Sequence, residues 1–413
     1  MNQRTKILYI IDCLNAWAGT EKHLYKLISG MDKGRYECHV CALALTEDMK
    51  NRFNALGANT FHLPINSIFG ATTLKQAYRL ARYMKTRRID VVQTFHFASD
   101  FLGTLVAKLA GVPVVISSKR DMGFLHNDAQ ARALRLIAPL VNRTICVSNA
   151  VKKGLAERKL INARQAVVFY NGVDLDEFKV DHRNIAARKQ QLGLRPGWPV
   201  VAVVANPRPI KDLETFIRAG REVLDRKHEA QFVIIGAECF HGGPGRYQQQ
   251  LEALVAKLGL QERVIFLGNR SDVNQILPLT EICVLTSLSE GFSNTIVEYM
   301  TAGRPVIATN VGGNGEAVVD NETGFLVPVK SPERLAELIV KLLGDKTLAT
   351  RLGKAGRKRI EKHFTLGRMV ENHQALYNAL LFKSGKGENS VRAHRLANSG
   401  RNRNPDGLVE AAN

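Results

Sequence analysis

Short apolar runs alternate with polar and amphipathic stretches along most of the chain. The runs are rich in Val and Ile and lack strict polar alternation, which is typical of parallel strands covered by helices on both faces. Thirteen runs are predicted as strands: KILYIIDCL, ECHVCALAL, NTFHLPI, DVVQTF, VPVVISS, RTICVS, AVVFYNG, VVAVVAN, QFVIIGA, RVIFLG, EICVLTS, RPVIAT and TGFLVPV. The pattern therefore predicts an α/β protein with two successive parallel sheets.

A polar stretch bounded by proline, DLDEFKVDHRNIAARKQQLGLRPGWP, follows the seventh run and is predicted as the linker. A chain of 413 residues also exceeds the usual size of a single core. We expect two Rossmann-like domains with room for a cleft between them. The expected division is residues 1–175 for the amino-terminal domain, 176–197 for the linker, 198–365 for the carboxy-terminal domain and 366–382 for a helix that returns to the amino-terminal domain.

Both ends of the chain need a separate interpretation. The start, MNQRTKILYII, has a basic head and an apolar run, but Asp12 interrupts it early, so it is predicted as a first strand rather than a signal peptide. Near the other end, SPERLAELIVKLL is predicted as a well-capped amphipathic helix. Residues 383–413 are rich in Asn, Gly, Ser and Arg and hold too little apolar surface to fold, so we expect a disordered basic tail.

The net charge of +20 narrows the choice of partners. Such an excess favours an anionic membrane leaflet or nucleic acid. Nucleic acid is not expected, because no aromatic-and-basic motif, zinc finger or zipper is visible. No apolar run approaches the roughly 20 residues of a membrane helix. We expect a soluble cytoplasmic protein, with peripheral binding to the inner face of the cytoplasmic membrane as a hypothesis.

The segment NDAQARALRLIAPLVNRT, residues 127–144, carries this hypothesis. It mixes apolar and cationic side chains as an interfacial helix does. Those side chains are Leu134, Leu136, Ile137 and Leu140 with Arg132, Arg135 and Arg143. A surface helix that packs on its own sheet would show the same mixture, and that alternative stays open.

Metal and redox sites find little support in the sequence. Cys38 and Cys41 lie in a predicted strand and have no second ligand pair at a zinc-finger spacing. Asp174 and Asp176 match the Asp-x-Asp string of metal-dependent transferases, but they open the linker. We expect no metal site and reduced thiols.

The stretch EGFSNTIVE, residues 290–298, places two carboxylates after an apolar run. In an open parallel sheet, ligands bind at the carboxyl ends of strands, where helix N-termini point amides at anions. If a helix begins near Ser293 or Asn294, Glu290 lies in the entering loop and Glu298 one turn into the helix. Glu290 can then accept hydrogen bonds from sugar hydroxyls, and Glu298 can bind a vicinal diol. A capping box from Thr295 to Glu298 is the structural alternative.

Glycines and cations at other strand ends extend this candidate site. Gly236 follows FVII and Gly312-Gly313 follow IATNV, where backbone can approach a phosphate closely. Arg208 and Lys211 follow VVAVVAN and could share a diphosphate. A simple tight turn is the alternative for the glycines, and a solvated loop is the alternative for the two cations. A site for a sugar nucleotide accounts for all these features together.

The sequence resembles the family 4 retaining glycosyltransferases, which have the GT-B fold of two Rossmann-like domains facing across a cleft. EGFSNTIVEYM is similar to their Glu-x7-Glu motif. Further matching pieces appear in the family's order from about Lys6 to Tyr377. They are AGTEKHL, SKRDMG, ICVSNAV, FYNGVDLDEF, NPRPIKD, FLGNRSDV, RPVIATNVGGNGEAV and TGFLVP.

This resemblance implies roles for individual residues. Glu290 lies near the donor hexose, and Gly291, Phe292 and Ser293 offer backbone amides to it. Glu298 holds the ribose, while Arg208 and Lys211 grip the diphosphate. The remaining donor-side residues are Gly19 in the first loop, His96, Asn294, Thr295 and Gly236.

Two of these assignments depart from the family pattern. Many members place the arginine five residues before the lysine, where this chain has Asn206, so Arg208 would be a substitute. His96, in VVQTFHFASD, matches the family's His-x-His pattern only within one position, and a packed histidine is the alternative.

The resemblance also implies the chemistry. A hexose passes from a nucleoside diphosphate donor to an alcohol acceptor, a cell-surface glycan or lipid-linked precursor, with retention at the anomeric carbon. No metal and no cofactor besides the donor are expected, and Glu290 is not assigned as a nucleophile. Lys119, Arg120 and Asp121 are candidate acceptor-side residues.

Other functions remain open on the sequence. A GT-B phosphorylase would use inorganic phosphate in place of the alcohol, and a sugar-nucleotide epimerase shares the architecture. A non-catalytic nucleotide-binding scaffold is the alternative outside enzymes. A dinucleotide-dependent dehydrogenase fits poorly, because IIDCLNAWAGTEKHL lacks the Gly-x-Gly-x-x-Gly turn.

Overall fold

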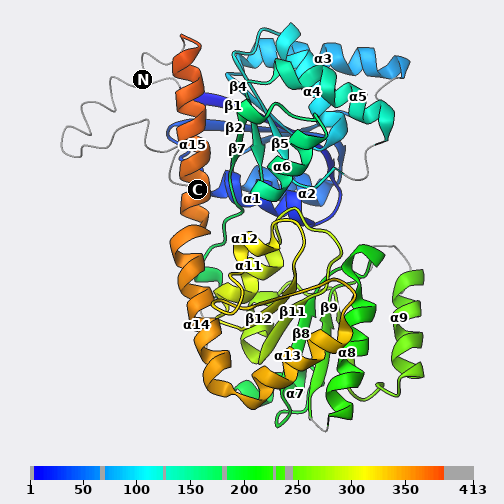
Figure 1. The fold of residues 1–413 in the computed structure, drawn as a ribbon. Helices are drawn as coiled ribbons and strands as arrows, with labels where there is room; N and C mark the ends of the chain where they lie inside the picture. The colour runs from blue at the N-terminus through cyan, green and yellow to red at the C-terminus, as the bar shows by residue number, and fades with distance from the viewer. Residues whose placement is uncertain are drawn as a thin grey trace, which may run out of the picture.

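The computed structural model describes residues 4–65, 70–123, 127–178, 184–226, 229–237 and 245–385. Within them the chain forms two α/β domains, one above the other in Figure 1. Most of the basic tail expected at residues 383–413 lies outside the described residues, which end one turn after the last helix.

The amino-terminal domain holds a seven-stranded parallel sheet of order β3-β2-β1-β4-β5-β6-β7. Its strands are β1 (Thr5–Leu14), β2 (Tyr36–Leu45), β3 (Asn59–His62), β4 (Val91–Phe95), β5 (Val114–Lys119), β6 (Arg143–Cys146) and β7 (Ala166–Val168). Its helices are α1 (Gly19–Gly30), α2 (Glu47–Ala55), α3 (Ala71–Arg87), α4 (Phe97–Leu109), α5 (Asp128–Ile137) and α6 (Asn149–Glu157).

The carboxy-terminal domain repeats this topology with a six-stranded parallel sheet of order β10-β9-β8-β11-β12-β13. Its strands are β8 (Val200–Val204), β9 (Gln231–Ile235), β10 (Val264–Gly268), β11 (Ile282–Leu285), β12 (Val306–Thr309) and β13 (Phe325–Val327). Its helices are α7 (Ile185–Gln191), α8 (Leu213–Asp225), α9 (Arg246–Lys257), α10 (Val273–Ile276), α11 (Asn294–Thr301), α12 (Asn314–Ala317), α13 (Pro332–Gly344) and α14 (Lys346–His363). The α/β prediction is confirmed, and each predicted run overlaps one of these strands.

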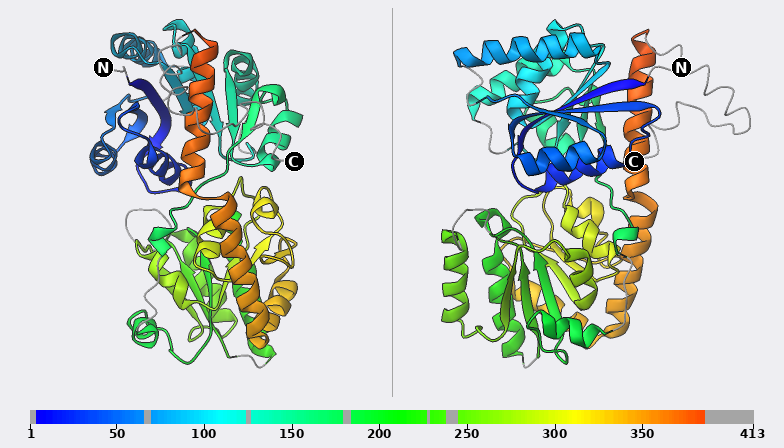
Figure 2. Two further views of the ribbon diagram at one scale, coloured as in Figure 1. Left: turned by 90° about the vertical axis from the view of Figure 1, so that its left-hand side faces the viewer. Right: turned by 180° about the vertical axis from the view of Figure 1, so that it is seen from behind.

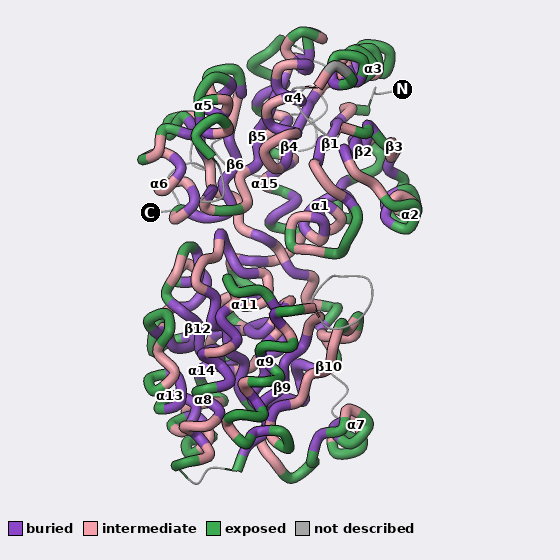
Figure 3. Tube along the Cα trace, turned by 90° about the vertical axis from the view of Figure 1, so that its right-hand side faces the viewer, coloured by how far each residue is buried: buried purple, intermediate pink, exposed green. Residues whose placement is uncertain are grey.

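The strand order reverses between β1 and β4 in one sheet and between β8 and β11 in the other. At such a switch point the connections leave in opposite directions, and a crevice opens beyond the carboxyl ends of the two strands. Buried strands lie between more exposed helices in both domains (Figure 3). The fold thus offers one crevice in each domain.

The chain passes between the domains at two places that hydrogen-bond to each other. Val173 N donates to Phe364 O at 2.9 Å, and Leu366 N donates to Val173 O at 2.8 Å. Gly172 is required beside this pair, because a Cβ there would come within 2.6 Å of Thr365 O. The two crossings therefore act as one hinge.

After the second crossing, α15 (Leu366–Lys383) runs back along the amino-terminal domain. Figures 1 and 2 show α14 on the lower domain and α15 on the upper one. Met369, Tyr377 and Leu381 are buried in the core formed by β1, β2, α1 and α2. The last helix is thus part of the first domain's core.

Three local features of the structure add to or correct the sequence analysis. The segment predicted as a linker contains α7, although residues 179–183 within it lie outside the described residues. Ser331 makes no capping hydrogen bond for α13; its hydroxyl donates instead to Val329 O at 3.1 Å. Cys38 and Cys41 point to opposite faces of β2, since they belong to different core clusters, and so cannot share a metal.

The segment predicted as an interfacial helix divides its apolar side chains between core and surface. Leu134 and Ile137 are buried against the domain, whereas Leu136 and Leu140 are exposed. The helix therefore packs on its own domain and leaves two leucines of this segment exposed, and the interfacial role stays a prediction.

His373, in α15, is fully buried among aromatic rings and has its charged form suppressed. Its ring centroid lies 5.1 Å from that of Phe169 and 6.1 Å from that of Tyr377. Burial, together with the nearby charge of Arg120, lowers the pKa of His373 to about 4, while the hydrogen bond with Met369 O opposes the shift. The neutral ring is therefore the stable form in the folded protein.

This burial predicts an acid-sensitive stability. The unfolded chain takes up a proton at His373 near pH 6.5 and the folded chain near pH 4, so stability is complete above pH 6.5 and falls between these values. In urea unfolding, the free energy of unfolding should fall between pH 7.5 and pH 5 by about 2 kcal/mol more for the wild type than for His373→Gln. Exposed His62→Gln is the control and should behave as wild type; equal losses in all three proteins would contradict the prediction.

Candidate functional site

The predicted site residues lie in loops that follow the strands at both switch points. In the carboxy-terminal domain, Arg208 and Lys211 follow β8, and residues 290–294 follow β11. In the amino-terminal domain, Gly19 follows β1 and His96 follows β4. Contacts between these loops, described below, show that the two crevices face each other.

Lys211 and Glu290 form the centre of the carboxy-terminal half. Lys211 Nζ lies 2.6 Å from Glu290 Oε1, with both side chains mostly buried. The Thr286 hydroxyl donates to Lys211 O at 2.8 Å, so the end of β11 fixes the backbone of the lysine. Arg208 is exposed one turn earlier, at the start of the short 3₁₀ helix η4 (Pro209–Lys211).

Ser293 caps α11, with its hydroxyl accepting a hydrogen bond from Ile296 N at 3.4 Å. This confirms that the helix begins at Asn294. The capping-box alternative is wrong, because the third residue of the helix is Ile296 and Glu298 lies beyond it. Asn294 and Glu298 are therefore one turn apart on the same face.

Glu298 faces two lysines of the other domain. Asn294 and Glu298 on α11 line a small cavity whose opposite wall carries Lys22 and Lys26 on α1. Burial raises the pKa of Glu298, and the charges of Lys22 and Lys26 oppose that shift. A polar ligand entering here would meet a carboxylate on one wall and ammonium groups on the other.

The loop before α11 is packed tightly against the amino-terminal domain. A Cβ at Gly291 would come within 2.3 Å of Arg120 O, so only glycine fits. The ring of Phe292 is buried, with its centroid 5.1 Å from that of Tyr170 and 5.4 Å from that of Phe364. Its side chain therefore packs at the domain interface.

Gly19 and His96 form the opposite wall. Gly19 is the first residue of α1, and its carbonyl accepts a hydrogen bond from Asn294 Nδ2 at 3.4 Å. His96 Nε2 lies 3.2 Å from Thr20 Oγ1. The backbone of His96 has φ 69° and ψ 178°, a conformation that costs a residue other than glycine about 1–3 kcal/mol. Such strain is a frequent feature of functional sites.

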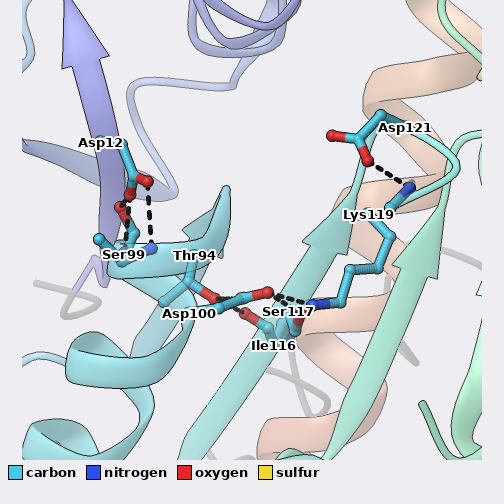
Figure 4. Close-up of polar contacts among 10 residues, drawn as sticks. Asp12, Thr94, Ser99, Asp100, Ile116, Ser117, Lys119 and Asp121 are labelled. Carbon is cyan, nitrogen blue, oxygen red and sulfur yellow. Dashed lines mark hydrogen bonds and ion pairs between the residues drawn. The ribbon is translucent and has the colours of Figure 1, made fainter. Parts of the chain in front are cut away.

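A polar network holds the loop that carries His96 (Figure 4). Asp12 accepts hydrogen bonds from Ala98 N at 3.0 Å and Ser99 N at 2.6 Å, at the start of α4. Asp100, almost fully buried, accepts from Ser117 Oγ at 2.9 Å. The remaining donors to Asp100 are the Thr94 hydroxyl and the Lys119 ammonium group.

These contacts bear on the candidate acceptor residues. Lys119 is committed to Asp100, Arg120 donates to the Asn171 side chain, and Asp121 accepts from Gly123 N at 2.6 Å. All three therefore have structural partners at the rim of the cleft.

Gly236 and Thr295 lie at the edges of the site. Gly236 has φ 141°, and a Cβ there would come within 2.2 Å of Ala205 O, so this glycine lets the ends of β8 and β9 approach. Thr295 is a half-buried residue in the first turn of α11.

The glycine pair 312–313 serves the same loop. A Cβ at Gly312 would come within 1.7 Å of Glu290 O, and Gly313 N donates to Gly291 O at 3.2 Å. The pair makes room for the loop that carries Glu290, as a tight turn does.

Glu21 is a residue that the sequence analysis quoted within AGTEKHL but did not assign. It is nine-tenths buried in the first turn of α1, and Oε2 lacks a hydrogen-bond partner among the described residues. Burial raises the pKa of Glu21, and the charges of His96 and Arg208 oppose the shift. Its position before the histidine of GTEKHL gave no sign of this burial.

No cluster of three or more His, Cys, Asp or Glu side chains able to hold a metal occurs among the residues described. Asp174 Oδ1 accepts a hydrogen bond from Asp176 N at 3.0 Å, so the Asp-x-Asp string closes a backbone turn. In the described part of the chain, no helix is both long enough and apolar enough to cross a membrane.

Two family models match the chain, one for each domain. The model described as Glycosyltransferase Family 4 matches residues 17–177, and the model described as Glycosyl transferases group 1 matches residues 184–359.

Characterised relatives and solved structures agree with these matches. Over 315 residues the chain is 27% identical to the UDP-Gal:alpha-D-GlcNAc-diphosphoundecaprenol alpha-1,3-galactosyltransferase of Escherichia coli, spanning 74% of this chain and 79% of that protein. Over 310 residues it is 25% identical to the N-acetyl-alpha-D-glucosaminyl L-malate synthase of Bacillus anthracis, spanning 74% and 73%. Anabaena Alr3699/HepE in complex with UDP superposes with a TM-score of 0.80 at 21% identity, covering 91% of this chain and 100% of HepE.

Three observations lead to one conclusion. Two parallel-sheet domains face each other, their strand-end loops meet across the interface, and a glycosyltransferase family model matches each half of the chain. The chain belongs to the group 1 glycosyltransferases and has their GT-B fold.

Proposed function

We propose that this glycosyltransferase transfers a hexose from a nucleoside diphosphate donor to an alcohol acceptor with retention of the anomeric configuration. The observation that carries the proposal is the Lys211–Glu290 pair, 2.6 Å apart at the switch point of the carboxy-terminal sheet. It places a cation and a carboxylate side by side, where a diphosphate and its sugar would need them.

The donor would bind chiefly to the carboxy-terminal domain. Arg208 and Lys211 supply positive charge for the diphosphate, and the first turn of α11 adds backbone amides. Glu298, one turn into α11, is placed to accept hydrogen bonds from the ribose hydroxyls. The backbone of Gly291 to Thr295 and the loop at Gly236 complete this wall, while Gly19 and His96 close it from the other domain.

Catalysis would then be mainly electrostatic. As the bond from the sugar to the diphosphate lengthens, negative charge grows on the phosphate beside Arg208 and Lys211. The departing phosphate can accept the proton of an acceptor that attacks from the same face, which gives retention. Because Glu290 is paired with Lys211, we assign it to orient a sugar hydroxyl and not to attack the anomeric carbon. We propose that no metal or organic cofactor takes part.

A lipid-linked acceptor at an anionic leaflet is the acceptor that we favour. The E. coli relative is named for a diphosphoundecaprenol acceptor. In this chain α3, α4 and α5 lie next to one another on the amino-terminal domain (Figure 1). Together with the short 3₁₀ helix η1 (Ala138–Leu140) that follows α5, they expose large apolar side chains, namely Leu74, Tyr78, Leu109, Leu136 and Leu140.

Charge complementarity supports a membrane as the partner of this apolar surface. Helix α3 carries five basic residues and no acidic one: Lys75, Arg79, Arg82, Lys85 and Arg87. Exposed Arg132 and Arg135 on α5 extend the same charge. Each Lys or Arg near an anionic surface contributes about 1 kcal/mol.

A small acceptor that is not bound to lipid is the second candidate. Other relatives are named for D-inositol 3-phosphate and L-malate as acceptors. The amino-terminal crevice around Glu21 and His96 offers polar groups that could hold such a molecule.

The donor class is tested by incubating the full chain with a panel of nucleotide sugars and a glycan acceptor. We expect release of a nucleoside diphosphate, an α-linked product from an α-linked donor by NMR, and unchanged activity in EDTA. An inverted product would contradict the retaining mechanism, and sugar phosphate formed only when inorganic phosphate is added would identify a phosphorylase instead.

Two substitutions separate catalysis from donor binding. Lys211→Ala should lower kcat about 10²–10³-fold, because it removes a charge that stabilises the leaving group. Glu298→Ala should weaken binding of the nucleoside diphosphate about tenfold or more in calorimetry, because two hydrogen bonds to a charged group are lost. Exposed Lys257→Ala and Glu333→Ala are matched controls and should leave both quantities unchanged.

Membrane binding is tested by flotation with vesicles of phosphatidylglycerol or phosphatidylcholine. We expect binding to the anionic vesicles at low salt, and about tenfold weaker binding for the double variant Tyr78→Ser, Leu136→Ser, which loses two inserting side chains. Val329→Ser removes an exposed apolar side chain from the other domain and should bind as wild type. The proposed surface would be contradicted if all three proteins bound equally, or if the wild type bound neither kind of vesicle.

A further inference from the structure

The first turn of α6 donates hydrogen bonds to a side chain of the opposite domain. The first amides of a helix have no partner within it and require caps. Ser148 caps α6 in the usual way, accepting from Val151 N at 3.1 Å. The two amides between Ser148 and Val151 are Asn149 N and Ala150 N. Each donates a hydrogen bond of 2.8 Å to Glu316, which lies in α12 of the carboxy-terminal domain.

Glu316 receives four hydrogen bonds from the amino-terminal domain. Besides the two amides, Asn149 Nδ2 donates to Oε2 at 3.0 Å and the Tyr170 hydroxyl donates to the same oxygen at 2.9 Å. All four partners are donors, so the site requires an acceptor at both oxygens, which a carboxylate provides. The negative charge also lies at the positive end of the α6 dipole.

The backbone of Glu316 is anchored to its own domain. Arg359, in α14, donates through Nη2 to Glu316 O at 2.8 Å and through Nε to Ala317 O at 2.9 Å. Movement of the carboxylate relative to the carboxy-terminal domain is therefore restricted, and its contacts with α6 report the relative position of the domains.

The contacts of Glu316 continue directly into the loop that carries Glu290. Ser148 Oγ donates to Gly291 O at 2.7 Å, and Gly313 N donates to the same carbonyl at 3.2 Å. The residue that caps α6 thus also holds the backbone one position after Glu290. Helix α6, α12 and the Glu290 loop form one connected patch of the interface.

We propose that Glu316 is an interdomain latch: it caps α6 only when the domains are closed and thereby positions the Glu290 loop against the amino-terminal domain. It is a positioning residue and does not touch the donor. Opening the cleft would leave two helix amides and the carboxylate to be hydrated, so the closed form is favoured by the helix cap itself. The kinetic consequence rests on the proposed transferase function, whereas the latch does not.

The test is the isosteric substitution Glu316→Gln in the full chain. Because the carboxylate accepts through both oxygens, the Gln side chain must place its NH₂ group against at least one donor, so the cap is weakened while shape is kept. Hydrogen exchange should show the amides of residues 149–151 exchanging about tenfold faster, with the remaining amides unchanged. Small-angle scattering should show a larger radius of gyration.

Glu322→Gln is the matched control, because it removes an exposed carboxylate from the same segment of the carboxy-terminal domain. It should leave both measurements at wild-type values. Tyr170→Phe removes one of the four hydrogen bonds and keeps the ring, so a smaller change of the same kind is expected. This milder variant decides the matter if Glu316→Gln does not fold.

In steady-state assays, Glu316→Gln should lower kcat about tenfold. Calorimetric binding of the nucleoside diphosphate alone should stay within about twofold, since that ligand would bind Lys211 and Glu298 within the carboxy-terminal domain. Unchanged exchange at residues 149–151 would overturn the latch, whatever the activity. If exchange and scattering change as expected but no nucleotide sugar is turned over, the latch stands and the proposed function fails.

Discussion

The relative position of the two sheets is the constraint on which the rest of the structure depends. Each sheet has its crevice where the strand order reverses, and a crevice alone holds half of the candidate site. The hydrogen bonds at Val173 join the two crossings of the chain, so one hinge sets how the crevices oppose each other. Glu316 and Ser148 then add hydrogen bonds across the interface beside that hinge, where Tyr170 contacts both Glu316 and Phe364. Lys211, Glu290 and Glu298 gain a facing wall only through this arrangement.

Glycines define how close the two halves can come. Gly172 at the hinge, Gly291 in the donor-side loop and Gly313 beside it each lie where a Cβ would collide with backbone or side chain of another segment. Cationic and anionic groups are arranged around these contacts, with Glu298 facing Lys22 and Lys26 across the interface. Close backbone approach and opposite charge therefore act at the same surface, and a ligand that enters must fit both.

The sequence predicted the fold well because its signals are local. Each strand is a continuous apolar run, and the start of α11 is indicated by Ser293 just before the helical stretch. The loops that carry Arg208, Lys211 and Glu290 were located because parallel strands end at one edge of a sheet. The contact of Glu316 with α6 could not be predicted, since residues 149 and 316 belong to different domains and neither has a local pattern that names its partner. The burial of Glu21 and the pairing of Lys119 with Asp100 escaped for the same reason, because burial depends on neighbours remote in the chain.

The path of α15 has a consequence for the order in which the molecule can assemble. Strand β1 is synthesised before α15, yet the core around β1 and β2 includes Met369, Tyr377 and Leu381 from that helix. The domain made first is therefore completed last, after the whole of the second domain has left the ribosome. Until then the apolar face that α15 covers is exposed on the nascent first domain, and exposed apolar surface of this kind is prone to aggregation.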